Sequence, residues 1–205
     1  ESSGLNSVDG VLFDLGLSSL QLEGENRGFS FKEDAFLDMR FDPKQELTAW
    51  DVVNRYSRAT LARVISDYGE EPRAARIADG IVKGRPIDTS RSLAEIVRSV
   101  VRRTLPRIHP ATRTFQAIRM EVNRELDNLR LALSQAISIL NQGGRLAVIS
   151  YHSLEDRLVK YFFREESVSG SNLRLINKKV IPASREEVRV NFRSRSARMR
   201  VAERI

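Results

Sequence analysis

The chain has 205 residues, of which 41% are hydrophobic and 30% are charged, so it is long enough for one large domain or two small domains with a packed core. It contains no cysteine, which excludes disulfides, thiolate metal sites and a cysteine nucleophile, and no apolar run approaches the ~20 residues that a membrane span needs, so we expect no membrane partner. The formal net charge of +7 favours a polyanionic partner, most simply nucleic acid, over an inert basic surface.

The first predicted element is a buried strand at about residues 8–15, which ends in a polar turn. Its apolar run from Val11 to Phe13 follows Gly10 and precedes Asp14, a pattern typical of a strand in a parallel sheet. Ligands of open α/β sheets bind just beyond the carboxyl ends of such strands, where Asp14 would accept hydrogen bonds from a ligand. The turn itself contains Gly16, Ser18, Ser19 and Gln21. The alternative is an ordinary strand and turn without a ligand.

The next part of the chain, after an irregular stretch at residues 23–46, has the pattern of short helices. Thr48 and Ser57 are suitable residues to cap the first two helices. The third is predicted at about 72–84, and the fourth begins with a capping-box pattern at 92–95. Four short helices with brief connections predict a small helical subdomain.

A long helix is then predicted from about residue 111 to residue 140, because apolar residues recur every three or four positions. Its first turns carry a polar face, which suits contacts to RNA or is simply solvated. The residues of this face that we expect to contact RNA are Arg113, Gln116, Arg119 and Asn123. Strands are predicted at about 145–151, 173–181 and 197–203, with helices at about 152–166 and 184–187.

A second polar cluster, residues 150–156, follows the strand at 145–151. In a parallel sheet it would lie at the same edge as Asp14. His152 suits a base or a hydrogen bond to a nucleobase, but it suits a helix cap equally well, and Ser153 with Asp156 suits a capping pair. The two histidines lack metal spacing, so we predict no metal site.

Seven arginines lie between residues 185 and 204, and guanidinium groups are well suited to phosphate contacts. We expect Arg193 and Arg195 among them to contact RNA. The sequence has no G-x-S-x-G motif, which argues against a hydrolase triad, and no G-x-G-x-x-G dinucleotide loop.

Seven further motifs stand out along the chain: Asp9–Ser19, Arg27–Phe31, Leu37–Arg40, Tyr68–Glu71, His109–Ala117, Ser153–Asp156 and Arg193–Ala197. Together they resemble the motifs of the bacterial MraW (RsmH) family, which methylates N4 of a cytidine in small-subunit ribosomal RNA. They occur in order and extend over essentially the whole chain.

The resemblance implies an α/β fold: a class I, Rossmann-like methyltransferase domain with a small all-helical domain inserted into it. We expect residues 1–22 and 111–205 to form the methyltransferase domain, and residues 24–108 to form the inserted substrate-recognition domain. The resemblance also implies that Asp14 and Gln21 contact the cofactor, S-adenosylmethionine. For the pocket that holds the target base we select Ser18, Ser19, His152 and Ser153.

The implied reaction is methylation of the exocyclic N4 amine of a cytidine in the decoding region of 16S ribosomal RNA. The small ribosomal subunit is then the expected partner and the cytoplasm the expected location, and the sequence leaves a homodimer open. The chain resembles the C-terminal two-thirds of family members, with the first three strands of the sheet and the Gly-Gly-His cofactor loop missing from it. Leu20 also stands where the family usually has proline. Two alternatives therefore stay open: a non-catalytic RNA-binding fragment and, more weakly, a nicotinamide-linked Rossmann enzyme.

Overall fold

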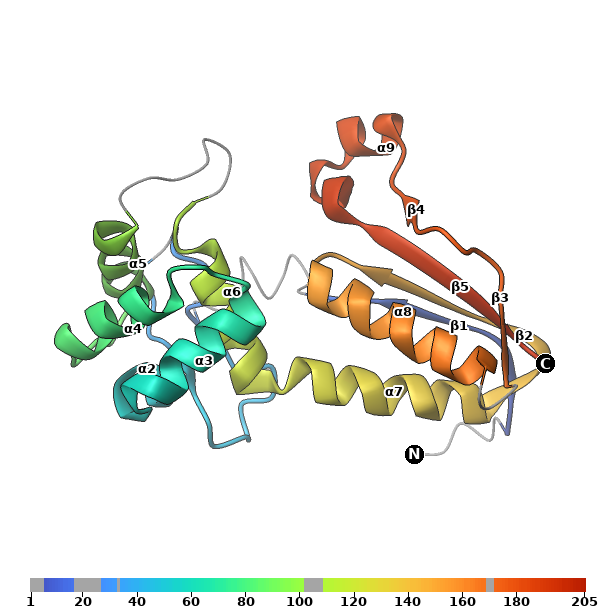
Figure 1. The fold of residues 1–205 in the computed structure, drawn as a ribbon, viewed down its shortest axis with the longest axis horizontal. Coiled ribbons are helices and arrows are strands. Elements are labelled where there is room, and N and C mark those ends of the chain that lie inside the picture. Colours follow the sequence, from blue (N-terminus) through green and yellow to red (C-terminus); the bar gives the residue numbers. More distant parts are fainter. Residues whose placement is uncertain (1–5, 17–26, 33, 102–108, 169–171) are drawn as a thin grey trace. The chain divides into compact units, whose positions relative to one another are not determined.

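The structure is a computed structural model that describes residues 6–16, 27–32, 34–101, 109–168 and 172–205. The chain forms two compact units, which are described separately (Figure 1). We call Glu1–Gly16 together with Leu126–Ile205 the sheet unit, and Leu17–Glu125 the helical unit. Within the described ranges, no helix has both the length and the apolar character needed to cross a membrane.

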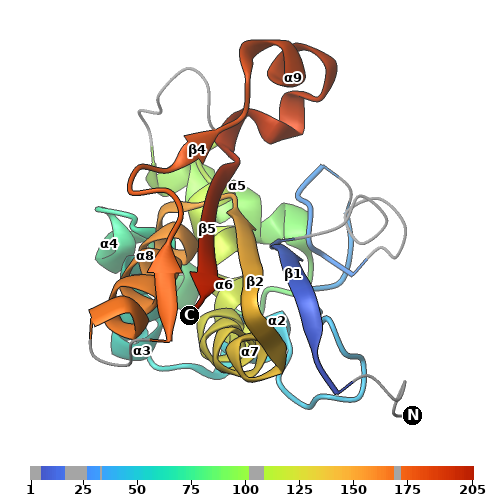
Figure 2. The ribbon, with the colours of Figure 1, turned by 90° about the vertical axis from the view of Figure 1, so that its right-hand side faces the viewer.

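A five-stranded mixed sheet forms the centre of the sheet unit (Figure 2). β1 (Val8–Asp14) pairs in parallel with β2 (Leu140–Ser150), and β5 (Arg198–Arg204) pairs antiparallel with the other side of β2. The short strands β3 (Leu173–Leu175) and β4 (Ile181–Pro182) both pair with β5. The parallel pairing confirms that the polar residues after β1 and β2 emerge at one edge. Because β5 is antiparallel to β2, it begins at that same edge.

One face of the sheet packs against α7 (Glu125–Ile139) and α8 (Ser153–Val168). Alternate residues of β2, Leu146 and Val148, point to this face and are buried in one apolar cluster with residues of both helices. The side chain of Leu12 in β1 belongs to the opposite face and is 63% exposed. The packed face is therefore the core of this unit.

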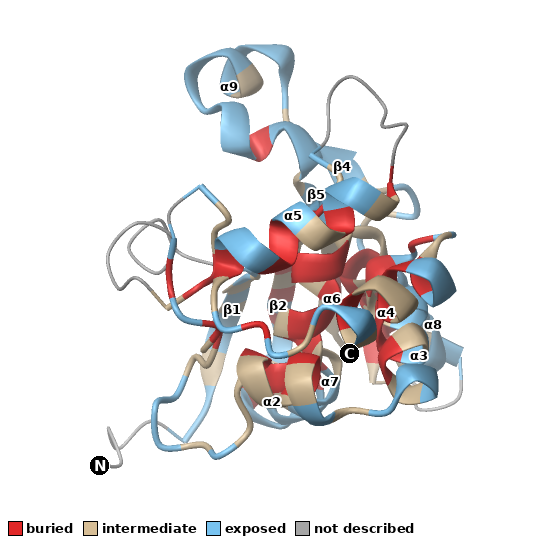
Figure 3. Cartoon of the chain, turned by 90° about the vertical axis from the view of Figure 1, so that its left-hand side faces the viewer, coloured by how far each residue is buried: buried red, intermediate tan, exposed pale blue. Residues whose placement is uncertain are grey.

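The helical unit has its own core, formed by five helices and the segment that precedes them. The helices are α2 (Ala49–Arg55), α3 (Arg58–Gly69), α4 (Ala74–Lys83), α5 (Ser90–Val100) and α6 (Thr112–Asn123). Thr48 and Ser57 cap α2 and α3 as predicted, whereas α5 is capped by Thr89 and not by Ser92. Figure 3 shows the buried residues along the inner sides of these helices.

The single long helix predicted over 111–140 is wrong, because the chain forms α6 and α7 there with Arg124 between them. Arg124 has a φ of 48°, in the left-handed region, which ends the first helix. The apolar stripe is continuous in sequence, but its first half, with Ile118, is buried in the core of the helical unit. Its second half, with Leu133, is buried in the core of the sheet unit. A periodic pattern cannot reveal that one stripe is shared between two cores.

The compact units also differ from the predicted domain limits, because residues 111–125 pack with the helical unit and not with the sheet. The strand predicted at 173–181 is two short strands instead. Between them Asn177 accepts a hydrogen bond from the backbone N–H of Val201 and donates to the carbonyl of Met199, so the chain leaves the regular ladder there. The remaining predicted strands and helices are present with shifted ends: β2 begins at Leu140, earlier than expected, and α9 (Arg185–Val190) replaces the short helix at 184–187.

We predict that Asn123→Ala destabilises the chain by roughly 1 to 3 kcal/mol, because it leaves buried backbone groups without partners. Asn123 is 5% exposed. Its side-chain amide donates a hydrogen bond of 2.7 Å to the carbonyl of Met39 and accepts one of 2.7 Å from the N–H of Phe41. Urea unfolding measures the effect. Gln135→Ala, at an exposed position of α7, is the matched control and should change stability by less than about 0.5 kcal/mol. Equal stability of both variants would contradict this role of Asn123.

Candidate functional site

The centre of the site is a contact between the ends of the two parallel strands. The hydroxyl of Tyr151 donates a hydrogen bond of 2.8 Å to the carboxylate of Asp14. Asp14 is the last residue of β1, and Tyr151 directly follows β2. Partial burial and the neighbouring Asp14 carboxylate raise the pKa of Tyr151 to about 12, so the hydroxyl stays protonated and donates at neutral pH. Asp14 is exposed, so its second carboxylate oxygen is available to a ligand at this edge.

The backbone after Asp14 is shaped for close approach. The N–H of Leu15 donates 3.0 Å to the carbonyl of Ile149, which extends the parallel ladder one residue beyond β1. Gly16 has a φ of +99°, a conformation that residues with a Cβ rarely adopt. Gly16 therefore departs from the extended conformation of the strand. Ser18, Ser19 and Gln21, which we expected in this turn, lie outside the described residues.

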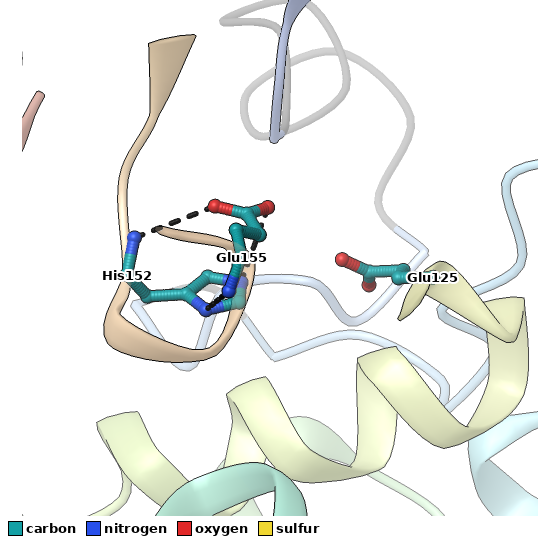
Figure 4. A group of neighbouring side chains, drawn as sticks. All are labelled: Glu125, His152 and Glu155. Carbon is teal, nitrogen blue, oxygen red and sulfur yellow. Dashed lines mark hydrogen bonds and ion pairs between the residues drawn. The ribbon is translucent and has the colours of Figure 1, made fainter. Parts of the chain in front are cut away.

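His152 lies at the start of α8, where its contacts are those of a helix cap (Figure 4). Its Nδ1 accepts from the N–H of Glu155 at 3.4 Å, and its Nε2 lies 3.1 Å from the Glu155 carboxylate. The same carboxylate accepts from the N–H groups of Tyr151, at 2.9 Å, and His152. The pair thus satisfies backbone donors that the first turn of a helix leaves free. Ser153 is the first residue of α8 and is half-buried. The catalytic roles of His152 and Ser153 stay predictions.

Asp156 joins α8 to β5. Its carboxylate accepts from Nε of Arg200 at 2.7 Å and from Nη1 of Arg198 at 3.3 Å. Burial alone would raise the pKa of Asp156, but the hydrogen bonds and charges of Arg200 and Arg198 outweigh it and hold this pKa below its ordinary value. The expected capping pair of Ser153 and Asp156 is therefore not the main use of this carboxylate, which anchors the beginning of β5.

The four residues on α6 that we expected to contact RNA all have partners within the helical unit. Arg113 donates a hydrogen bond of 3.1 Å to the carbonyl of Glu70, and Gln116 donates one of 3.0 Å to the carbonyl of Tyr68. Arg119 forms a bidentate ion pair with Glu125, and Asn123 bonds the backbone of Met39 and Phe41. These contacts give the polar face of α6 a structural role within the helical unit. Its role in RNA binding stays a prediction. Of the four, Arg113 has the most exposed charged group, with a side chain that is 44% exposed.

Arg193 and Arg195, by contrast, are exposed and belong to the short 3-10 helix η1 (Phe192–Ser196), just before β5. Since Arg198 pairs with Ser150 at the end of β2, η1 lies at the same edge of the sheet as Asp14 and Tyr151. The sheet unit thus places an acidic strand end and two exposed guanidinium groups at one edge.

Tyr151 and Glu155 belong to the predicted polar cluster at residues 150–156, but no role was predicted for either of them. Each had a usable signal: Tyr151 directly follows the second predicted strand, and Glu155 stands three residues after His152, at capping-box spacing. What the pattern could not supply was the hydroxyl–carboxylate contact between residues 137 positions apart.

Comparison with known proteins gives a family match over the whole chain. The profile of the MraW methylase family matches residues 1–205. A protein named ribosomal RNA small subunit methyltransferase H from Dehalococcoides mccartyi strain 195 is 54% identical over 212 residues, which cover 97% of this chain and 61% of the relative.

Proteins of the same name from Persephonella marina and Caldicellulosiruptor bescii are 50% and 47% identical, with 100% of this chain covered in both cases. The matches cover 71% and 72% of those relatives. The chain therefore spans only part of each relative's length, and 61% of the Dehalococcoides protein.

We predict that Asp156→Asn lowers the free energy of unfolding by roughly 1 to 3 kcal/mol at pH 7, because Arg200 and Arg198 lose their charged acceptor. The pKa of Asp156 is lower in the folded chain than in the unfolded chain, so the contribution is fully present above about pH 4. It is lost as the pH falls through the folded pKa.

Urea unfolding of both proteins from pH 7 to pH 2.5 should therefore show a stability gap that closes only at acid pH. Glu186→Gln, an exposed change on α9, is the control and should leave the pH profile unchanged. A gap that persists undiminished at pH 2.5 would rule out the charge of Asp156 as its source.

Proposed function

The chain belongs to the MraW methylase family, and on that premise we propose that the protein that carries it transfers a methyl group from S-adenosylmethionine to N4 of a cytidine in 16S ribosomal RNA. Support comes from the relatives, which are named small-subunit ribosomal RNA methyltransferases and are about half identical to this chain. The basic net charge of +7 agrees with an RNA substrate. The chain spans 61% of the first relative's length, so the reaction is proposed for the whole protein.

The observation that carries the proposal in this structure is the carboxylate of Asp14 at the end of a parallel strand. A carboxylate in this position accepts hydrogen bonds from hydroxyl and amine groups, and S-adenosylmethionine offers both. Tyr151 holds one oxygen of Asp14, which orients the carboxylate before a ligand arrives. Gly16 lets a ligand approach the backbone beside it. These groups fit the cofactor, and we propose that Asp14 and Gln21 bind it.

The N4 amine of cytosine is a poor nucleophile, since its lone pair is delocalised into the ring. S-adenosylmethionine, when bound, supplies a methyl group on a positively charged sulfur. The task of the chain's own residues is then to align the amine, exclude water and accept a proton from the amine. We propose that Ser18, Ser19, His152 and Ser153 surround the target base. His152 lies at the same sheet edge as Asp14, although its Nδ1 already accepts from Glu155.

We further propose that the sheet unit is part of a class I, Rossmann-like domain for S-adenosylmethionine, and that the helical unit is the inserted substrate-recognition domain. The mixed α/β sheet unit with its parallel β1–β2 pair supports the first assignment. The separate core of the helical unit supports the second, with residues 111–125 now included in the insert.

For RNA binding we propose Arg193 and Arg195, with Arg113 as a further contact from the helical unit. We propose the cytoplasm as the location of the reaction, since ribosomal RNA is the proposed substrate. A homodimer stays a prediction, which sedimentation of the whole protein at several concentrations would test.

We predict that Asp14→Ala weakens binding of S-adenosylmethionine by roughly 10- to 100-fold, since a hydrogen bond to a charged group contributes about 1.5 to 3 kcal/mol. Calorimetric titration of the whole protein measures this. Asp9→Ala is the matched control, because Asp9 is an exposed aspartate at the opposite end of the same strand.

Unchanged affinity in the Asp14→Ala protein would refute the cofactor assignment. Intact RNA binding by a wild-type protein that does not bind S-adenosylmethionine would instead favour the non-catalytic RNA-binding alternative.

We also predict that RNA affinity falls steeply with salt, and that Arg193→Ala with Arg195→Ala flattens this dependence. For single-stranded RNA, the slope of log K against log salt should decrease in magnitude by roughly 0.7 for each phosphate contact that is lost. Arg130→Ala removes an exposed arginine of α7 and should leave the slope unchanged. Equal slopes for the double variant and the wild type would show that neither arginine contacts an RNA phosphate.

A further inference from the structure

Residues 183–197 form an arm that projects from the sheet at the edge of the candidate site. The arm joins β4 to β5 and contains α9 and η1 (Figure 1). Pro182 pairs with Arg198, which in turn pairs with Ser150 at the end of β2. The connection between the two strands therefore lies beyond the edge where β1 and β2 also end.

The arm exposes apolar side chains that the rest of the sheet unit does not cover. α9 contains no buried residue, and Figure 3 shows it almost wholly in the colour of exposed residues. Val190 is 83% exposed and Phe192 is 66% exposed. An aromatic ring exposed to this extent beside a ligand-binding edge is suited to contact a partner.

Phe192 is presented as part of a stacked pair. The guanidinium carbon of Arg195 lies 4.2 Å from the centre of the Phe192 ring. The pairing follows from the 3-10 helix, in which residues three apart lie above one another. The guanidinium covers one face of the ring, and the high exposure of Phe192 leaves the other face open.

The stacked pair is held in place by two contacts within the arm. The side chain of Asn191 accepts from the N–H of Arg193 at 3.2 Å and so caps η1. Ser194 is 4% exposed, and its hydroxyl donates 2.7 Å to the carbonyl of Asn191. The conformation that presents Phe192 is therefore formed before a ligand binds, which reduces the entropy lost on binding.

The positive charge of the arm indicates that its partner is negatively charged. Residues 183–197 contain four arginines and two glutamates, for a formal charge of +2, and all four arginines are exposed. Arginine forks bind phosphate, and an open aromatic face stacks a base that is not paired in a duplex. An exposed ring combined with several arginines is the composition of a site for single-stranded nucleic acid.

We propose that this arm binds an unpaired RNA nucleotide next to the target cytidine, with its base stacked on Phe192 and its phosphates held by the arm's arginines. The inference rests on the proposed function for the identity of the RNA and extends it to a positioning element. The strand residues that flank the arm, Pro182 and Arg198, pair with each other, and Arg198 pairs with Ser150, the residue before Tyr151, so both ends of the arm lie at the edge of the Asp14–Tyr151 contact. A base held there would fix the RNA strand relative to the cofactor edge.

The test uses the whole protein and a short RNA from the decoding region that carries the fluorescent base 2-aminopurine next to the target cytidine. Stacking on Phe192 should change the fluorescence of this base on binding. Phe192→Ala should abolish that change and weaken RNA binding by roughly 5- to 150-fold, the range for loss of one base–aromatic stack. Phe192→Trp should preserve both, because an indole ring also stacks.

Val190→Ala is the matched control, since it truncates a more exposed apolar residue of the same arm without removing a ring. We expect it to bind RNA like the wild type. In methyl transfer, Phe192→Ala should raise the KM for RNA and leave the affinity for S-adenosylmethionine unchanged.

Wild-type RNA affinity in Phe192→Ala, or an equal loss in Val190→Ala, would overturn the stacking role while the proposed methyl transfer still stood. Failure of the wild-type protein to bind S-adenosylmethionine would instead overturn the proposed function, and the fluorescence of 2-aminopurine would still decide whether the arm stacks a base. A wild-type protein that binds no RNA at low salt would overturn both.

Discussion

The backbone ladder between β1 and β2 is the constraint on which the candidate site depends. It joins residues 10–14 to residues 145–149 in parallel register, and the N–H of Leu15 extends it to Ile149. Parallel neighbours end at the same edge, so the two polar segments that follow them must meet there. The Asp14–Tyr151 hydrogen bond is the direct result, formed between residues 137 positions apart. A shift of this register by one residue would turn every side chain of β1 to the other face and move Asp14 away from the tyrosine.

Several charged side chains near this edge stabilise the surrounding structure. Glu155 is the residue that satisfies the backbone at the start of α8, and Asp156 binds the two arginines that begin β5. Both carboxylates lie in the Ser153–Asp156 motif, so contacts within the sheet unit account for these two residues of the motif. The groups that remain exposed at the edge, Asp14 and the arginines of the arm, differ in charge. This separation suits a cofactor with hydroxyl and amine groups on one side and an RNA phosphate chain on the other.

The helical unit reaches its stability through a separate core, and α6 shows how polar residues contribute to it. Asn123 is 5% exposed, and its side-chain amide forms hydrogen bonds with the backbone N–H of Phe41 and the backbone carbonyl of Met39, both in the segment before α2. Arg119 and Glu125 form a half-buried bidentate pair at the end of the same helix. These are the residues that a reading of the sequence associates with a nucleic-acid surface, because arginine, glutamine and asparagine serve equally well in recognition and in internal hydrogen bonds. Only their partners distinguish the two uses.

The sequence alone determined the first strand and its terminal carboxylate, the caps of α2 and α3, the second strand, the helical character of residues 48–101 and the family to which the motifs point. These features depend on neighbours in sequence: apolar runs, capping residues and ordered motifs. Only the tertiary structure decided that the helix predicted over 111–140 breaks at Arg124. The apolar residues before the break are buried in the core of the helical unit, and those after it are buried in the core of the sheet unit. The tertiary structure also decided that the polar face of α6 is used internally, that Tyr151 holds Asp14, and that the short helix carrying the Phe192–Arg195 pair lies at the same edge. The hydrogen-bond partners of Arg113, Asn123 and Tyr151 lie 43, 84 and 137 positions away, and such separations leave no periodic trace in the sequence.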